Sequence, residues 1–152
     1  MKYTITVLIR KPIEDCFRLL QDHESRKHWH LGLTSFEHLC GLPNEVGGQM
    51  KLNYTFGKRN LSVIETVTHI ENNKTVHYNF DSAGMHNIQE NQFKVVDDNS
   101  TIWTCNNEFI PTTFSKRLML LLMPKAIKLQ SEKYLHDFKN YIEIGKSVKN
   151  YT

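Results

Sequence analysis

A long stretch of two-residue periodicity between Phe36 and Ile110 constrains the fold more than any other feature. Apolar and polar side chains alternate within it, for example over residues 50–56, and turn residues interrupt the pattern, for example at residues 57–60 and 97–100. Alternation of this kind is typical of antiparallel strands that bury one face, and short turns of Gly, Asn and Asp connect such strands. We therefore expect residues 36–110 to form an antiparallel meander.

Residues 3–9 also alternate between apolar and polar side chains, which predicts one further strand before the meander. Pro12 stands at a favourable first position of a helix, and Glu14 and Asp15 follow in its first turn, where acidic side chains are favoured. Asp22 is a typical N-cap residue, and we expect it to begin a second short helix that continues to His30. Two short helices are thus predicted after the first strand.

After the meander, residues 114–144 show the 3.6-residue periodicity of a long helix. Pro124 lies inside this segment, where proline removes one hydrogen bond and clashes with the preceding turn, so we expect a kink or break there. Residues 118–123 are apolar on every side of the helix. Two interpretations remain open for them: a flexible lid over a ligand, which methionine would suit, or a fully buried segment.

The length of 152 residues is typical of one domain, and we expect residues 1–152 to form a single α+β domain. Hydrophobic residues make up 39% of the chain, which excludes a disordered protein. The longest apolar run, residues 118–123, is far shorter than the roughly 20 residues that cross a bilayer, so no stable membrane insertion is expected. The N-terminus lacks the apolar block of a secretion signal, which predicts a cytoplasmic protein with free thiols at Cys16, Cys40 and Cys105.

Basic charge is concentrated at the C-terminal end of the chain. The whole chain has a formal net charge of +3, whereas residues 112–152 alone carry eight basic and three acidic groups. A basic helix can attract phosphates or anionic lipid head groups, although a solvated outer helix face is the simpler interpretation. No nucleic-acid-binding motif is present, so no nucleic-acid partner is expected, and we expect a monomer or a weak homodimer.

Several short motifs match those of one known superfamily. They are Lys-Pro-Ile-Glu-Asp-Cys-Phe at residues 11–17, Asp22 followed by Trp29, Gly41 with Gly47 and Gly48, Val-Ile-Glu at residues 63–65, and Thr101. On these residues the chain resembles the SRPBCC superfamily, which includes START lipid-transfer domains, birch-pollen-allergen-like proteins and polyketide cyclase/dehydrase-like bacterial proteins. The resemblance implies a helix-grip fold, in which a curved antiparallel sheet of about seven strands wraps a long C-terminal helix and leaves an apolar cavity.

Side chains that point toward the expected helix would line this cavity. Strand alternation assigns a set of apolar residues to that face, together with Asn107. Asn87, Gln89 and Asn91 have the parity of Phe93; they either face the cavity, where a ligand or water would satisfy them, or belong to an edge segment that faces water. The expected ligand-binding residues are Leu52, Tyr54, Phe56, Tyr78, Phe80, Phe93, Trp103, Cys105, Asn107, Leu118, Leu122 and Met123.

The histidines and cysteines indicate no metal site. His23, His28 and His30 lie close together in the sequence, but their spacing is not that of a known zinc motif. The cysteines form no Cys-x-x-Cys pair. We therefore expect neither a metal nor a cofactor.

The sequence offers few candidates for catalysis. Glu65 and His69 share strand parity, so both would lie on one face, where they could act as acid and base inside the cavity. Tyr54 and Tyr78 could donate a hydrogen bond to a carbonyl group of a substrate. A structural ion pair explains Glu65 equally well, and no nucleophile motif is visible.

Three functions are consistent with these patterns. The leading hypothesis is a non-catalytic protein that binds a small hydrophobic or amphipathic molecule, lipid or polyketide-like, between the sheet and the terminal helix. The second is an enzyme of the polyketide cyclase/dehydrase kind that uses a Glu, His or Tyr of the cavity as acid or base. The third is a protein-interaction module similar to the activators of the heat-shock-protein-90 ATPase, which an exposed apolar patch at residues 118–123 without an internal cavity would favour.

Overall fold

A curved, seven-stranded antiparallel sheet dominates the computed structural model, which describes residues 1–151, with residues 150 and 151 described by their backbone alone. The order across the sheet is β1-β7-β6-β5-β4-β3-β2, so each strand after β1 pairs with its neighbour in sequence and β1 pairs with β7. The expected meander is therefore present, although its first strand begins earlier than predicted. The strands are β1 (Lys2–Ile9), β2 (Leu33–Cys40), β3 (Gln49–Phe56), β4 (Arg59–Glu71), β5 (Thr75–Ser82), β6 (Met85–Asp97) and β7 (Ser100–Pro111).

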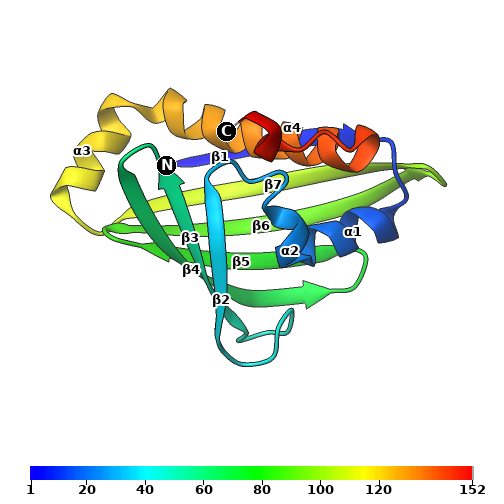
Figure 1. Cartoon of the computed structure of the whole chain (residues 1–152), viewed down its shortest axis with the longest axis horizontal. Helices are drawn as coiled ribbons and strands as arrows, with labels where there is room; N and C mark the ends of the chain where they lie inside the picture. The colour runs from blue at the N-terminus through cyan, green and yellow to red at the C-terminus, as the bar shows by residue number, and fades with distance from the viewer. Residues whose placement is uncertain (152) are drawn as a thin grey trace.

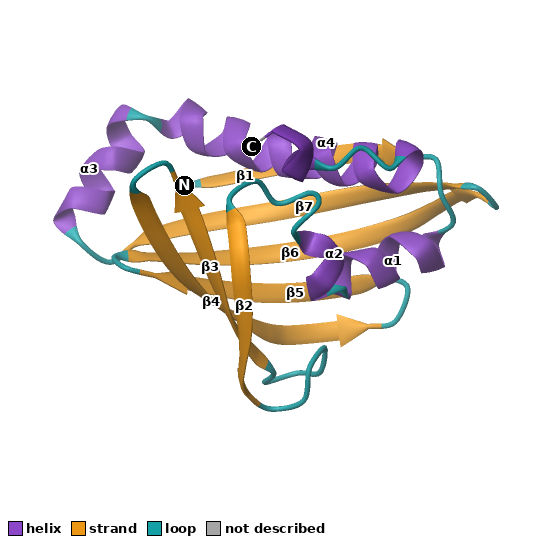
Figure 2. Cartoon of the chain, in the orientation of Figure 1, coloured by secondary structure: helices purple, strands orange, loops and turns teal. Residues whose placement is uncertain are grey.

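The helices lie on one side of this sheet (Figure 1). α1 (Ile13–Gln21) and α2 (His23–Arg26) connect β1 to β2, and α3 (Phe114–Leu122) and α4 (Pro124–Ile144) follow β7. A short 3₁₀ turn at Val148–Tyr151 comes after α4. The sheet bends so that β2 and β3 run crosswise to β6 and β7, and α4 packs beside β1 (Figure 2). The predicted α+β order of elements is confirmed.

The beginnings of the two short helices were predicted correctly, and the end of the second was not. Pro12 precedes the first residue of α1, and the Asp22 side chain accepts a hydrogen bond of 3.1 Å from the backbone N–H of Glu24 at the start of α2. α2 ends at Arg26 rather than at His30. The backbone N–H of His28 donates to the carbonyl of Ser25 at 2.9 Å, a three-residue spacing that tightens the chain into a turn.

The break expected at Pro124 is confirmed. Met123 has a non-helical backbone (φ −131°, ψ 45°) between the end of α3 and the start of α4, and Pro124 is the first residue of α4. Proline is tolerated at this position because the missing N–H would have no intrahelical partner. The break turns α3 away from the axis of α4, so the two helices do not form one rod (Figure 1).

The hydrophobic core lies between one half of α4 and the sheet. The Phe138 ring of α4 is fully buried and packs edge-on against Trp103 of β7, with ring centroids 4.8 Å apart, and against Trp29, at 5.0 Å. Trp103 also stacks on Phe93 of β6, at 5.6 Å. These large rings fill the space beneath the C-terminal half of α4 and leave its N-terminal half less tightly packed.

Cys16, Cys40 and Cys105 are free thiols, as predicted, and Cys16 and Cys105 are buried. Within the described part of the chain, no helix has the length and apolar character needed to cross a bilayer.

Candidate functional site

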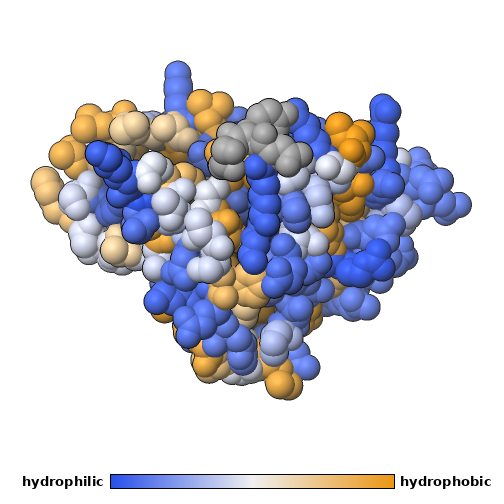
Figure 3. All heavy atoms as spheres, in the orientation of Figure 1, coloured by the Kyte–Doolittle hydropathy of each residue, from blue (hydrophilic) through white to orange (hydrophobic). Residues whose placement is uncertain are grey.

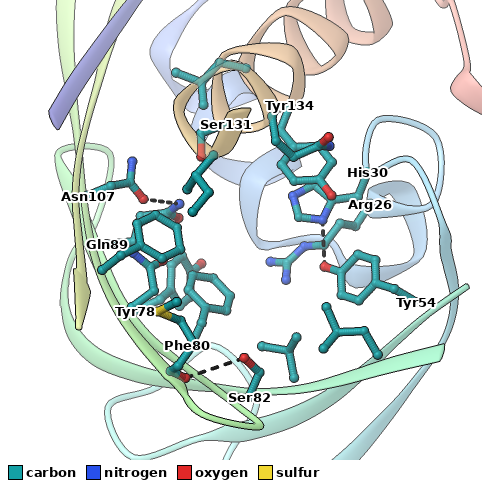
Figure 4. A pocket seen from close by; sticks show the side chains of 18 of the residues that line it. Arg26, His30, Tyr54, Tyr78, Phe80, Ser82, Gln89, Asn107, Ser131 and Tyr134 are labelled. Atoms are coloured by element: carbon teal, nitrogen blue, oxygen red, sulfur yellow. Dashed lines mark hydrogen bonds between the residues drawn. The ribbon is translucent and has the colours of Figure 1, made fainter. Parts of the chain in front are cut away.

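A cavity of about 280 Å³ lies between the sheet and the N-terminal half of α4 (Figure 4). Its walls come from β3 to β7, from the segment around α2, and from one face of α4. The apolar residues at its rim, Phe56 and Leu61, are 40% and 39% exposed, which places the opening beside the β3–β4 turn. Six of the residues predicted to bind a ligand line this cavity, namely Tyr54, Phe56, Tyr78, Phe80, Trp103 and Asn107.

The other predicted lining residues lie elsewhere. Leu52, Phe93 and Cys105 face inward as expected, but they are packed within the hydrophobic core and do not reach the cavity. Leu118, Leu122 and Met123 were wrongly assigned to the cavity wall, because α3 turns away from the sheet at Pro124. These three side chains are 44%, 72% and 55% exposed. Residues 118–123 are therefore not a fully buried segment, and none of them lines the cavity.

One side of the cavity carries side-chain amides joined by hydrogen bonds. Gln89 donates to the Asn107 amide oxygen at 3.3 Å, and Asn91 donates to the Gln89 amide oxygen at 3.2 Å. The Trp103 indole N–H donates to Asn91 at 3.0 Å. Asn87 and Asn91 are 6% and 0% exposed, so this part of β6 faces inward, and the alternative of an edge segment facing water is excluded.

The opposite side of the cavity carries a histidine and two tyrosines. The Nδ1 atom of His30 and the hydroxyl of Tyr54 are 2.7 Å apart, and the His30 ring stacks on Tyr134 of α4 with centroids 4.0 Å apart. Removal from water lowers the pKa of His30 to about 3, and the nearby charge of Arg26 acts in the same direction. Burial also raises the pKa of Tyr54. The hydrogen bond therefore joins two neutral groups near neutral pH.

Arg26 of α2 forms a buried ion pair next to this histidine. It lines the cavity and is 2% exposed, and its guanidinium binds the carboxylate of Glu65, which also contacts His23 Nε2 at 2.9 Å. Burial by itself would raise the pKa of Glu65, but the positive charge of Arg26 and the hydrogen bond with His23 lower it to about 2. Arg26 Nε and Trp29 Nε1 have no hydrogen-bond partner among the described residues.

Sequence reasoning missed several residues of the cavity wall. Arg26 is the last residue of α2, and His30 lies in the turn that follows it. No local sequence pattern shows that this segment lies against β3 and β4. By contrast, Ile127, Ser131 and Tyr134 of α4 all line the cavity and share one helix face through their spacing of four and three residues. That spacing was visible in the sequence and could have identified them.

No known family model matches the chain, and no curated protein matches it. Solved structures do. The Zhui aromatase/cyclase from a Streptomyces species has a TM-score of 0.73 at 12% identity, over 97% of this chain and 99% of that one. Ara h 8.0201 has a TM-score of 0.73 at 12% identity, over 93% and 97%. The Aha1 dimer from Colwellia psychrerythraea has a TM-score of 0.63 at 18% identity, over 97% and 99%.

The chain has the helix-grip fold. The resemblance to SRPBCC proteins is thus confirmed at the level of the fold. At 12–18% identity the likeness does not extend to a shared ligand or reaction.

In this helix-grip fold, the expected pairing of Glu65 with His69 on one face is wrong. The register between β4 and β5 shifts between Val67 and His69, which marks a β-bulge. An extra residue in one strand reverses which side chains point inward beyond it. Glu65 is 1% exposed, whereas His69 is on the outer face, with its ring centroid 5.0 Å from that of His77.

The buried, neutral His30 predicts a specific dependence of stability on pH. The free energy of unfolding should decrease as the pH falls from 6.5 toward about 3, because unfolded His30 takes up a proton that the folded protein excludes. One such group contributes a slope of up to about 1.4 kcal/mol per pH unit. In urea unfolding at several pH values, His30→Gln should show a shallower slope than the natural protein. Equal slopes would contradict the neutral state of His30.

Proposed function

We propose that the protein binds a small amphipathic molecule in the cavity between α4 and the sheet. The observation that carries the proposal is a largely apolar wall with polar groups at two opposite sides, Gln89 and Asn107 on one and Arg26 and His30 on the other (Figure 4). Small-molecule sites have this composition, because apolar contacts supply affinity and a few polar groups fix orientation. The volume of about 280 Å³ lies near the lower end of the roughly 300–1,000 Å³ usual for such sites.

The polar groups constrain the chemistry of this ligand. Gln89 and Asn107 carry amides, which both donate and accept hydrogen bonds, whereas Arg26 can only donate. Unpartnered buried donors such as Arg26 Nε and Trp29 Nε1 are costly, so an acceptor near them would be favoured. The ligand that fits best has an apolar body, a carbonyl or other acceptor oxygen at one end, and a polar group at the other.

Catalysis has less support than binding. Glu65 is engaged by Arg26 and His23, and His69 lies outside the cavity, so the proposed acid–base pair is not assembled. Tyr54 and Tyr78 do line the cavity, and burial raises the pKa of each, so both act as hydrogen-bond donors rather than bases. One structural neighbour is an aromatase/cyclase, which keeps an enzymatic role as the second candidate.

A cytoplasmic location and a monomeric or weakly dimeric state are part of the same proposal. Three free thiols are typical of proteins in a reducing compartment. A neighbour described as a dimer shows that this fold is compatible with self-association.

Ile127→Trp tests the binding site. Ile127 lines the cavity from α4, so an indole there should occupy part of its volume and weaken binding of the apolar probe N-phenylnaphthylamine at least about tenfold, since overfilled pockets have no room to adjust. Fluorescence titration measures the dissociation constant. The matched control is Ile144→Trp, the same change at a residue of α4 that is 73% exposed.

Binding that weakens in the control as much as in Ile127→Trp would contradict the proposal. So would probe binding that survives Ile127→Trp and is lost when the exposed leucines of α3 are replaced, because the probe would then occupy the surface. Circular dichroism of each variant checks that the fold is retained.

A further inference from the structure

α3 presents its apolar side chains to solvent, which reverses the usual arrangement of a surface helix. Phe114, Leu118, Leu121 and Leu122 have the spacing i, i+4, i+7 and i+8, which places them within an arc of about 100° on one helix face. They are 80%, 44%, 74% and 72% exposed, and Leu120 is the residue of α3 that is buried. We call these four exposed residues, Phe114, Leu118, Leu121 and Leu122, the α3 surface.

The α3 surface is a contiguous feature at one end of the molecule. Figure 3 shows apolar atoms gathered at the end where Figure 1 places α3. Single exposed apolar residues are common in proteins, whereas a group of four on one face of a helix is typical of an interaction site.

Basic residues predominate around this surface. Residues 114–129 contain Lys116, Arg117, Lys125 and Lys128 and no acidic residue. Arg117 lies next to the apolar arc on α3. Lys125 and Lys128 lie beyond the break and are exposed, and Lys128 forms an ion pair with Glu132 at 3.8 Å. An anionic partner surface would therefore be attracted over the whole corner.

We propose that the α3 surface docks onto the surface of an anionic lipid bilayer. Apolar side chains that insert at the head-group boundary, flanked by Lys and Arg, are the features that hold an amphipathic helix in that plane. The nine residues of α3 span about 13.5 Å, which suits a helix lying in the interface and not one crossing the membrane. A second copy of the chain fits less well, since two such corners would bring Lys116, Arg117 and Lys125 of each copy together, and residues 114–129 contain no acidic residue to offset them.

This surface adjoins the cavity. α4 follows α3 directly after the break at Met123, and Ile127 and Gln130 near the start of α4 line the cavity. Docking at this corner would bring the cavity opening close to lipid. The membrane proposal depends on other residues than the ligand-binding proposal, so either one can be correct without the other.

The test is cosedimentation with lipid vesicles. Binding to vesicles of phosphatidylcholine mixed with phosphatidylglycerol should be at least about tenfold tighter than to phosphatidylcholine alone. It should weaken when the salt concentration rises from about 0.1 M to about 1 M, where the screening length falls from about 10 Å to about 3 Å. Leu121→Asp with Leu122→Asp should reduce binding to the anionic vesicles at least about tenfold.

The matched control is Leu42→Asp with Val46→Asp, two leucine-sized or smaller apolar residues that are each 63% exposed in the β2–β3 loop, far from α3. It should bind vesicles like the natural protein. Arg117→Glu with Lys125→Glu supplies a second variant that changes only charge, should the leucine variant fail to fold.

No binding to anionic vesicles, equal binding to both vesicle types, or equal loss in the control would overturn the proposal. A concentration-dependent dimer in sedimentation velocity that the Leu121→Asp, Leu122→Asp variant abolishes would also overturn it, by assigning the surface to a second copy.

Discussion

Glu65→Gln is expected to lower the free energy of unfolding by about 3–5 kcal/mol, because it leaves the guanidinium of Arg26 buried without a counter-charge. Both side chains are almost completely buried, so water cannot compensate for the lost carboxylate. Glutamine keeps the size of glutamate, which separates the loss of charge from a loss of packing. Total stabilities of domains are about 5–15 kcal/mol, so this change would bring the protein close to unfolding.

Urea unfolding of the natural protein and the variant measures the difference. Glu71→Gln is the matched control, because Glu71 pairs with Lys74 at 2.7 Å on the surface and should contribute less than about 1 kcal/mol. Replacing both charges, as Arg26→Met with Glu65→Leu, should recover much of the loss. Equal effects of Glu65→Gln and Glu71→Gln would show that the buried pair has no special role.

The same ion pair has a defined pH dependence. The pKa of Glu65 is lowered from 4.5 to about 2, so its contribution to stability is fully present above pH 4.5 and is lost as the pH falls through 2. Glu65→Gln should abolish this part of the acid transition. This window overlaps that of His30 only below pH 4.5, so the loss of stability between pH 6.5 and 4.5 reports His30 alone and the two variants distinguish the groups.

Phe138→Ala is expected to lower the free energy of unfolding by about 3–5 kcal/mol. The Phe138 ring is 0% exposed and lies between Trp29 and Trp103, so its removal leaves a cavity that two rigid indoles cannot close. The packing that holds α4 against the sheet depends on this contact. Urea unfolding measures the loss, and Ile144→Ala on the exposed face of α4 is the control, with an expected change within about 0.5 kcal/mol.

A loss below about 1 kcal/mol for Phe138→Ala would mean that α4 is held in place by other contacts. In that case the hydrophobic core would not be concentrated under the C-terminal half of α4. Near-ultraviolet circular dichroism of Trp29 and Trp103 would show whether the indoles have moved into the vacated space.

The elements of the fold followed from patterns that are local in the sequence. Alternation over two residues predicted the strands, Asp22 predicted the start of α2, and Pro124 predicted the break between α3 and α4. Each of these depends on the steric or hydrogen-bonding properties of a few consecutive residues, so no tertiary information was needed. The same alternation placed Asn107 and Tyr78 correctly on the inner face.

Prediction of the site failed where one backbone irregularity or one helix direction decided the outcome. A single bulge after Val67 moved His69 to the outer face, and nothing in the residue types of β4 marks its position. The direction of α3 after β7 left Leu122 in solvent, although its sequence suits a core equally well.

The amino-acid sequence alone determined which segments are strands and helices, and that the chain builds a layer of strands with a long C-terminal helix. Only the tertiary structure decided which side chains meet. Arg26 reaches Glu65, His30 reaches Tyr54, and Gln89 reaches Asn107 across gaps of 39, 24 and 18 residues in the chain. Local patterns arise from neighbours within a few residues, whereas such contacts depend on how the sheet curves and how the helices pack, which is a property of the whole chain.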